Sequence, residues 1–175
     1  MEISREGAKD IAAKGRWRFF AKIRETFMLR AFAFFKIPML HFMGPVVEEI
    51  SDERCVVRIP LYRRTRNHLK SMYFAVLAAG ADCAGGLIAL RFIRKSGGHV
   101  SLVFKDFKAE FLKRAEADVW FTCEDGPAIR DLVAEAISSG QRVQRSINIT
   151  ATVPSKLGSE PVAKFEMTLS LKAQG

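Results

Sequence analysis

The sequence predicts an α+β domain in which a strongly curved antiparallel sheet wraps around one long central helix. Residues 72–90 are nearly uncharged and built mostly from small side chains, which is typical of a helix packed closely on its neighbours. Several later segments alternate apolar and polar residues, the period-two pattern of half-buried strands. With 175 residues, 49% of them hydrophobic, the chain has the size and composition of a single folded domain.

The expected central helix contains one charged residue, Asp82. Its adjacent glycines, Gly85 and Gly86, would each destabilise a helix by about 1 kcal/mol relative to alanine, so we expect close packing to compensate. A membrane span is the alternative, because about 18 apolar residues are enough to suggest one. An Asp at the centre of a span is unfavourable by roughly 2.5–3.5 kcal/mol, which favours a buried helix.

Near the N-terminus, residues 16–37 predict a basic amphipathic helix that ends at Pro38. Two interpretations fit its aromatic and basic residues: packing on the rest of the chain or on a second subunit, and contact with a membrane surface. We divide the chain into a lead-in with this helix, residues 1–43, packed on a domain formed by residues 44–175. The apolar stripe of the helix consists of Trp17, Phe20, Ile23, Phe27, Ala31, Phe34 and Phe35.

The remaining elements follow from alternation and turn residues. A hairpin is expected from Val46 to Leu61, around a polar turn at residues 51–54. Alternation in residues 99–112 slips at Lys105-Asp106, which predicts a bulge in a long strand. The other expected elements are a strand over residues 115–123, a short helix over 126–138 between Pro127 and Gly140, and strands over 143–153 and 163–171.

The net charge of +9, from 28 Lys and Arg against 19 Asp and Glu, favours an anionic partner. The basic residues are scattered without an aromatic platform, so nucleic acid is not expected. Cys55, Cys83 and Cys123 form no CxxC pair and fit a reducing compartment. His41 and His99 lack acidic or sulfur companions at metal spacing, so no metal site is expected. The first fifteen residues show no secretory signal, and we expect a cytoplasmic protein.

The segment from Asn67 to Asp82, NHLKSMYFAVLAAGAD, resembles the motif N-x-H-G-T-V-H-G-G-x-x-x-x-x-A-D of hotdog-fold acyl-CoA thioesterases of the phenylacetate-pathway type. It is also similar to a neighbouring family of uncharacterised predicted thioesterases. Aligned without gaps, Asn67, Ser71 and Asp82 meet the family's Asn, Thr and Asp. The resemblance covers residues 44–173 and implies a hotdog fold, to which this chain adds an N-terminal helix. The family's His-Gly-Gly is replaced by Tyr73, Phe74 and Ala75.

The resemblance implies hydrolysis of the thioester in acyl-coenzyme A. In the family, a backbone N–H at the start of the helix polarises the thioester carbonyl; here it belongs to Phe74 or Ala75. The helix carboxylate, here Asp82, acts as base or nucleophile and usually faces a neighbouring subunit, so we expect a homodimer or a dimer of dimers. Burial should raise the pKa of Asp82 towards that of a useful base. Coenzyme A is part of the substrate, and no separate cofactor is implied.

Substrate-binding candidates precede the helix. Arg63, Arg64 and Arg66 are candidates for contacting the coenzyme A phosphates, the alternative being a solvated loop. Ser71, at the family's Thr position, belongs to the same group of candidates.

Other roles remain open for several of these residues. Asp82 is either catalytic or a structural carboxylate hydrogen-bonded across a subunit interface. Asn67 either holds the turn or steadies the substrate carbonyl, and Tyr73 either donates its hydroxyl or packs. Because Phe74 is bulky where the family has glycine, a non-catalytic acyl or fatty-acid binding protein is the alternative function. A hotdog dehydratase would need a histidine, and Tyr73 stands in its place.

Overall fold

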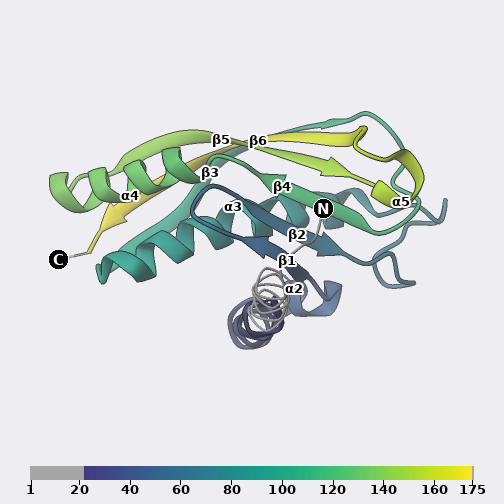
Figure 1. The fold of residues 1–175 in the computed structure, drawn as a ribbon, viewed down its shortest axis with the longest axis horizontal. Helices are drawn as coiled ribbons and strands as arrows, with labels where there is room; N and C mark the ends of the chain where they lie inside the picture. The colour runs from purple at the N-terminus through teal and green to yellow at the C-terminus, as the bar shows by residue number, and fades with distance from the viewer. Residues whose placement is uncertain (1–21, 175) are drawn as a thin grey trace, which may run out of the picture.

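The computed structural model describes residues 22–174 as a six-stranded antiparallel sheet curved around one long helix (Figure 1). The strand order is β1-β2-β4-β5-β6-β3, and the predicted α+β architecture is confirmed. A helical segment over residues 22–36 comes first. The elements that follow are α2 (Pro38–Met43), β1 (Val46–Ile50), β2 (Cys55–Ile59), α3 (Phe74–Ser96), β3 (Val100–Phe111), β4 (Val119–Cys123), α4 (Gly126–Ser139), β5 (Val143–Thr152), α5 (Pro154–Leu157) and β6 (Pro161–Ala173).

Close packing explains two of the glycines in α3. A Cβ atom at Gly80 would lie 2.3 Å from two ring carbons of Phe121 on β4, and a Cβ at Gly85 would lie 2.7 Å from Cδ1 of Ile147 on β5. These side chains occupy the space that a larger residue on α3 would need. The helix is long and apolar enough to cross a membrane by length and composition, but 72% of its apolar stretch is buried inside the domain, which favours the core helix.

β3 forms one edge of the sheet and pairs with β6 alone. Its register with β6 shifts between Phe104 and Phe107, so the bulge predicted at Lys105-Asp106 is confirmed. The side chains of Val103, Phe107 and Phe111 are exposed along this edge. An unpaired edge with exposed apolar residues is a ready surface for another strand.

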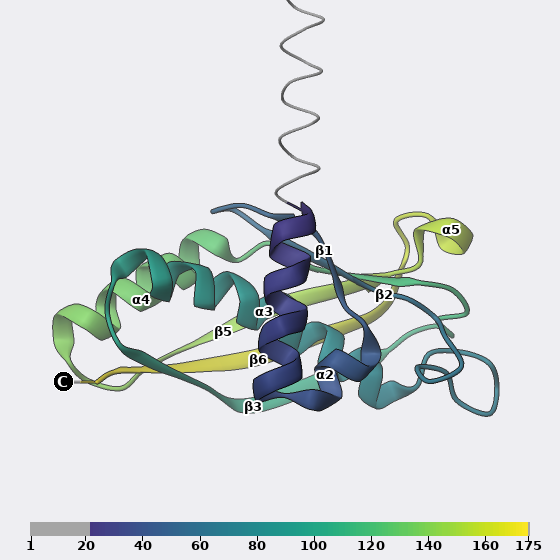
Figure 2. The ribbon, with the colours of Figure 1, turned by 90° about the horizontal axis from the view of Figure 1, so that it is seen from below.

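The N-terminal segment crosses α3 on the side away from the sheet (Figure 2). Leu29 and Ala33 of this segment are buried, as are Leu40 and Met43 of α2. The predicted helix extends over residues 16–37, of which 16–21 lie outside the described residues. The helix is interrupted at residue 37. Pro38 begins α2, at a position where its missing N–H is not needed.

Two strands are shorter than predicted. β2 ends at Ile59 rather than Leu61, because Pro60 has no N–H for the ladder and the N–H of Leu61 donates to Oδ1 of Asp118 at 2.9 Å. β4 begins at Val119 rather than Ala115, whose carbonyl instead accepts the N–H of Met72 at 2.7 Å. Both departures connect the sheet to the loop that enters α3.

Candidate active site

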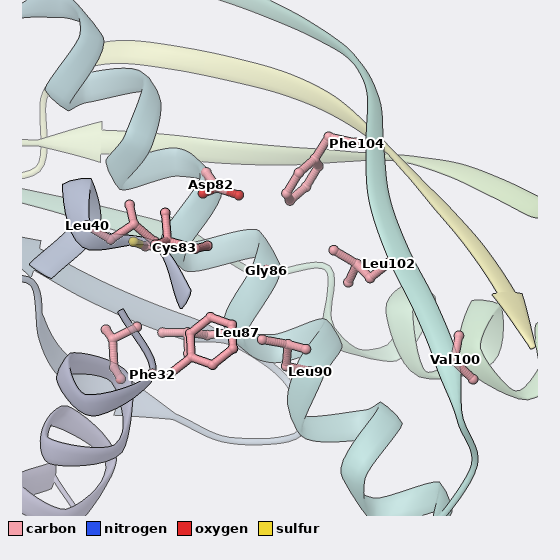
Figure 3. Close-up of a pocket in the computed structure, with 12 residues that line it drawn as sticks. Phe32, Leu40, Asp82, Cys83, Gly86, Leu87, Leu90, Val100, Leu102 and Phe104 are labelled. Carbon is pink, nitrogen blue, oxygen red and sulfur yellow. The ribbon is translucent and has the colours of Figure 1, made fainter. Parts of the chain in front are cut away.

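An apolar cavity of about 350 Å³ lies between the N-terminal segment, α2, α3 and β3 (Figure 3). Asp82 is the one charged residue that lines it. This volume is at the lower end of the range of about 300–1,000 Å³ for small-molecule sites, which are also mostly apolar with few polar groups. The lining residues are Leu29, Phe32, Ile37, Leu40, Asp82, Cys83, Gly86, Leu87, Leu90, Val100, Leu102 and Phe104.

The carboxylate of Asp82 points from α3 towards Phe104 of β3 (Figure 3). It forms no hydrogen bond or ion pair with another residue in the described part of the chain. Burial raises the pKa of this carboxyl above its ordinary value, because an apolar surrounding disfavours the charged form and no cation among residues 22–174 offsets that effect. Such a carboxylate is suited to accept a proton from a bound molecule.

Gly86 keeps the space beside this carboxylate open. It lies one helical turn after Asp82, and a Cβ atom there would be 3.8 Å from Oδ1 of Asp82 and 3.8 Å from Cζ of Phe104. Gly80 and Gly85 therefore pack against the sheet, whereas Gly86 borders the cavity. The sequence did not predict that Phe104, Leu29 and Phe32 would line the site. Gly86, four residues after Asp82, was the sequence feature that could have indicated open space beside the carboxylate.

The start of α3 offers backbone donors. Tyr73 is the N-cap residue, and its carbonyl accepts the N–H groups of Val76 at 2.9 Å and Leu77 at 3.1 Å. The N–H groups of Phe74 and Ala75 form no hydrogen bond within residues 22–174. Tyr73 and Phe74 are 45% and 58% exposed and pack edge to face, with ring centroids 4.8 Å apart. The helix end thus presents free donors beside two exposed aromatic rings.

The helix geometry separates these donors from Asp82. Ala75 and Asp82 differ by seven residues, so they share a face of α3 but lie about 10 Å apart along its axis. One carbonyl group cannot contact both within a single chain. The structure therefore does not bring the predicted oxyanion donors and the predicted base together in one protomer.

Asn67 holds the turn that leads to α3. Its Oδ1 accepts hydrogen bonds from the N–H of Leu69 at 2.9 Å, and from the N–H and Oγ of Ser71, both at 3.2 Å. Lys70 adopts the left-handed conformation, with φ of 62°, at the position of a glycine in the motif. Ser71 is buried in this turn, so its hydroxyl is committed to Asn67.

The three arginines of the preceding loop are exposed next to the start of α3. The carbonyl of Thr65 accepts the N–H of Tyr73 at 2.9 Å, which ties the loop to the helix. The guanidinium of Arg64 stacks over the rings of Phe42, at 5.6 Å, and Tyr62, at 5.2 Å. Among the described residues, Arg63 and Arg66 have no ion-pair partner, which leaves their charges to an external anion.

Cys83 also lines the cavity, but burial raises the pKa of its thiol and disfavours the reactive thiolate. Asp82 is thus the lining side chain best suited to proton transfer. In the described part of the chain, no three His, Cys, Asp or Glu side chains converge as a metal site would require.

Residues 25–171 match the family described as "Domain of unknown function (DUF4442)". The protein PA5026 from Pseudomonas aeruginosa, of unknown function and described as a probable thioesterase, is 23% identical with a TM-score of 0.70, over 85% of this chain and 96% of that one. The protein OLEI01261 of unknown function from Chlorobaculum tepidum TLS is 13% identical with a TM-score of 0.75, over 87% and 97%. No curated protein matches the chain.

The thioesterase HI1161 from Haemophilus influenzae is 15% identical with a TM-score of 0.56, over 77% of this chain and 82% of that one. At these identities the similarity concerns the fold. The hotdog fold predicted from the sequence is confirmed.

Proposed function

Because the chain belongs to the DUF4442 family and has the hotdog fold of proteins described as thioesterases, we propose that it is a thioesterase-like hydrolase that cleaves acyl-coenzyme A. The observation that carries the proposal is Asp82, an unpartnered carboxylate of raised pKa facing an apolar cavity. The acyl chain occupies the cavity, and the thioester lies beside the carboxylate. Gly86 leaves room for it there.

The reaction needs a base or nucleophile and an oxyanion donor. As a base, Asp82 takes a proton from water, and the hydroxide adds to the thioester carbonyl carbon. The tetrahedral oxyanion is stabilised by backbone N–H groups at the start of an α3 helix, where the helix dipole is also positive. The C–S bond then breaks, and the leaving thiolate takes the proton back, which yields a carboxylic acid and coenzyme A.

Two protomers form each site. The distance of about 10 Å between Ala75 and Asp82 along α3 supports a site in which the donors and the base come from different chains. The exposed edge of β3 supports a dimer, because its unpaired backbone groups and apolar residues Phe107 and Phe111 are suited to a second copy. Phe111 lies 6.4 Å from Phe74, between ring centroids, so pairing along this edge also brings helix starts to the interface.

Coenzyme A phosphates bind at Arg63, Arg64 and Arg66. The three guanidinium groups are exposed and next to the start of α3, and arginine matches phosphate geometry with two parallel hydrogen bonds.

The test is release of free thiol from acyl-CoAs of varied chain length by wild type, Asp82→Asn and a matched control, Asp131→Asn, at an exposed position on α4. We expect a loss of at least about a hundredfold in Asp82→Asn, in the range typical of general-base removal, and full activity in the control. Equal rates in all three would refute the role of Asp82. Single turnover in heavy-oxygen water distinguishes the two mechanisms, since only a nucleophilic Asp82 acquires the label.

A second candidate function is supported by Phe74, a bulky and exposed side chain where an oxyanion site would need an open approach. A hotdog protein of this kind would bind acyl-CoA or fatty acid without cleaving it. Calorimetric titration with acyl-CoA that shows binding by wild type, together with no turnover, would establish this alternative. Phe74→Gly then restores access and is expected to raise turnover if the ring is the obstacle.

A further inference from the structure

The N-terminal segment and α2 are apolar on two opposite faces. The inner face packs on the domain through Leu29, Ala33, Leu40 and Met43. The outer face, which we define as Phe27, Phe34, Phe35, Met39 and Phe42, is exposed. Phe27 and Phe35 are 71% and 77% exposed, the highest values among the large apolar side chains described. An exposed apolar face of this kind normally marks a surface that a partner covers.

The outer face is continuous and ends in a basic loop. The ring of Phe34 contacts those of Phe35 and His41, with centroids 5.1 Å and 5.2 Å apart, which joins the segment to α2. Arg64 then stacks over Phe42, which joins α2 to the loop before α3. Figure 2 shows the segment and α2 together in front of α3, on the outside of the domain.

The charge around this face is strongly positive. Residues 22–45 and 60–70 together hold eight Lys and Arg against a single acidic residue, Glu25. Glu25 pairs with Arg24 at 2.9 Å, and Lys22 pairs with Glu48 of β1. The other six basic side chains have no ion-pair partner among the described residues. These two stretches account for most of the net charge of +9. A partner that complements this face would therefore offer both an apolar region and negative charge.

We propose that the outer face docks on an anionic membrane surface. Phenylalanine rings enter the boundary between headgroups and acyl chains, and the surrounding Lys and Arg contact the headgroup phosphates. A second copy of the chain fits less well, because a two-fold contact would place this basic face against itself. Nucleic acid would satisfy the charge but would leave most of the apolar side chains in water. The proposal does not depend on thioester hydrolysis, although the other face of the same segment walls the cavity through Leu29 and Phe32.

The test is co-sedimentation of the full chain with vesicles of phosphatidylcholine mixed with phosphatidylglycerol, and with vesicles of phosphatidylcholine alone. We expect binding to the anionic vesicles that weakens with added salt and with removal of phosphatidylglycerol. Phe27→Gln combined with Phe35→Gln should lower the partition coefficient by at least about tenfold, because two buried rings return to water. Lys36→Gln should lower it by about fivefold on anionic vesicles.

Ile137→Gln on α4 is the matched control, since it removes an exposed apolar side chain away from the outer face and should leave binding unchanged. Both ring positions are exposed, so the double variant should keep the melting temperature of wild type, which excludes unfolding as the cause. Failure to bind anionic vesicles, equal binding to both vesicle types, or unchanged binding by the double variant overturns the proposal. A dimer or an RNA complex lost in the double variant, without vesicle binding, assigns the face to that partner and also overturns it.

Discussion

Alanine substitution of three glycines in α3 separates helix propensity from packing against the sheet. Each change gains up to about 1 kcal/mol of propensity in a helix interior. The space differs at each position. The new Cβ would lie 2.3 Å from the ring of Phe121 at Gly80, 2.7 Å from Cδ1 of Ile147 at Gly85, and no closer than 3.8 Å to any atom at Gly86. The same substitution should therefore change stability in different directions within one helix.

The expected order follows from what can move. At Gly80 the obstacle is the fully buried ring of Phe121, and overpacking of about 1–3 kcal/mol or more should exceed the propensity gain, so Gly80→Ala destabilises by about 1–2 kcal/mol. At Gly85 the obstacle is the end of a flexible side chain, so the two effects nearly cancel. Gly86→Ala meets ordinary contact distances and should stabilise by about 0.5–1 kcal/mol.

Urea denaturation of the three variants measures these free energies, and Ala78→Gly in the same helix calibrates the propensity contribution, about 1 kcal/mol. Wild-type stability in Gly80→Ala, or destabilisation by Gly86→Ala as large as that by Gly80→Ala, would refute the packing argument. Gly86→Ala also narrows the space beside Asp82, so under the proposed function it should combine higher stability with weaker binding of acyl-CoA.

Three other predictions test the site and its entry turn. Burial raises the pKa of Asp82 in the folded state, so the free energy of unfolding decreases as the pH rises from the ordinary pKa of about 4 to the raised pKa. Asp82→Asn should therefore raise the free energy of unfolding at about pH 7 but not at about pH 3. Equal effects at both pH values would contradict the burial argument. Lys70→Gly should stabilise by about 0.5–1 kcal/mol in urea titrations by relieving the left-handed conformation, whereas Lys70→Ala should not. Asn67→Ala should destabilise the protein by about 1–3 kcal/mol, because the hydrogen bonds of the turn are lost. Asn67→Asp should not, because it keeps the accepting oxygen. A stable but inactive Asn67→Asp variant would instead indicate that the side-chain amide contacts the substrate.

Sequence periodicity was sufficient to predict the main helices and strands and several local details. The slip in alternation at Lys105-Asp106 located the bulge in β3, because side chains must return to the same face after an inserted residue. Gly140 located the end of α4, where it adopts a left-handed φ of 64°. The short helix α5, the early end of β2 and the late start of β4 were missed. The two strand boundaries depend on hydrogen bonds between segments far apart in the sequence.

The residues around Asp82 show where local pattern stops being informative. The sequence alone predicted a single carboxylate within an apolar helix, because the charge and hydrophobicity of each residue are known from the sequence. That it faces Phe104, Leu29 and Phe32, with Gly86 keeping the space open, depends on side chains far apart in sequence meeting in three dimensions. The separation of about 10 Å between Ala75 and Asp82 depends on both sequence and structure. Helix geometry gives the distance from the sequence spacing, but only the structure shows that the helix is continuous.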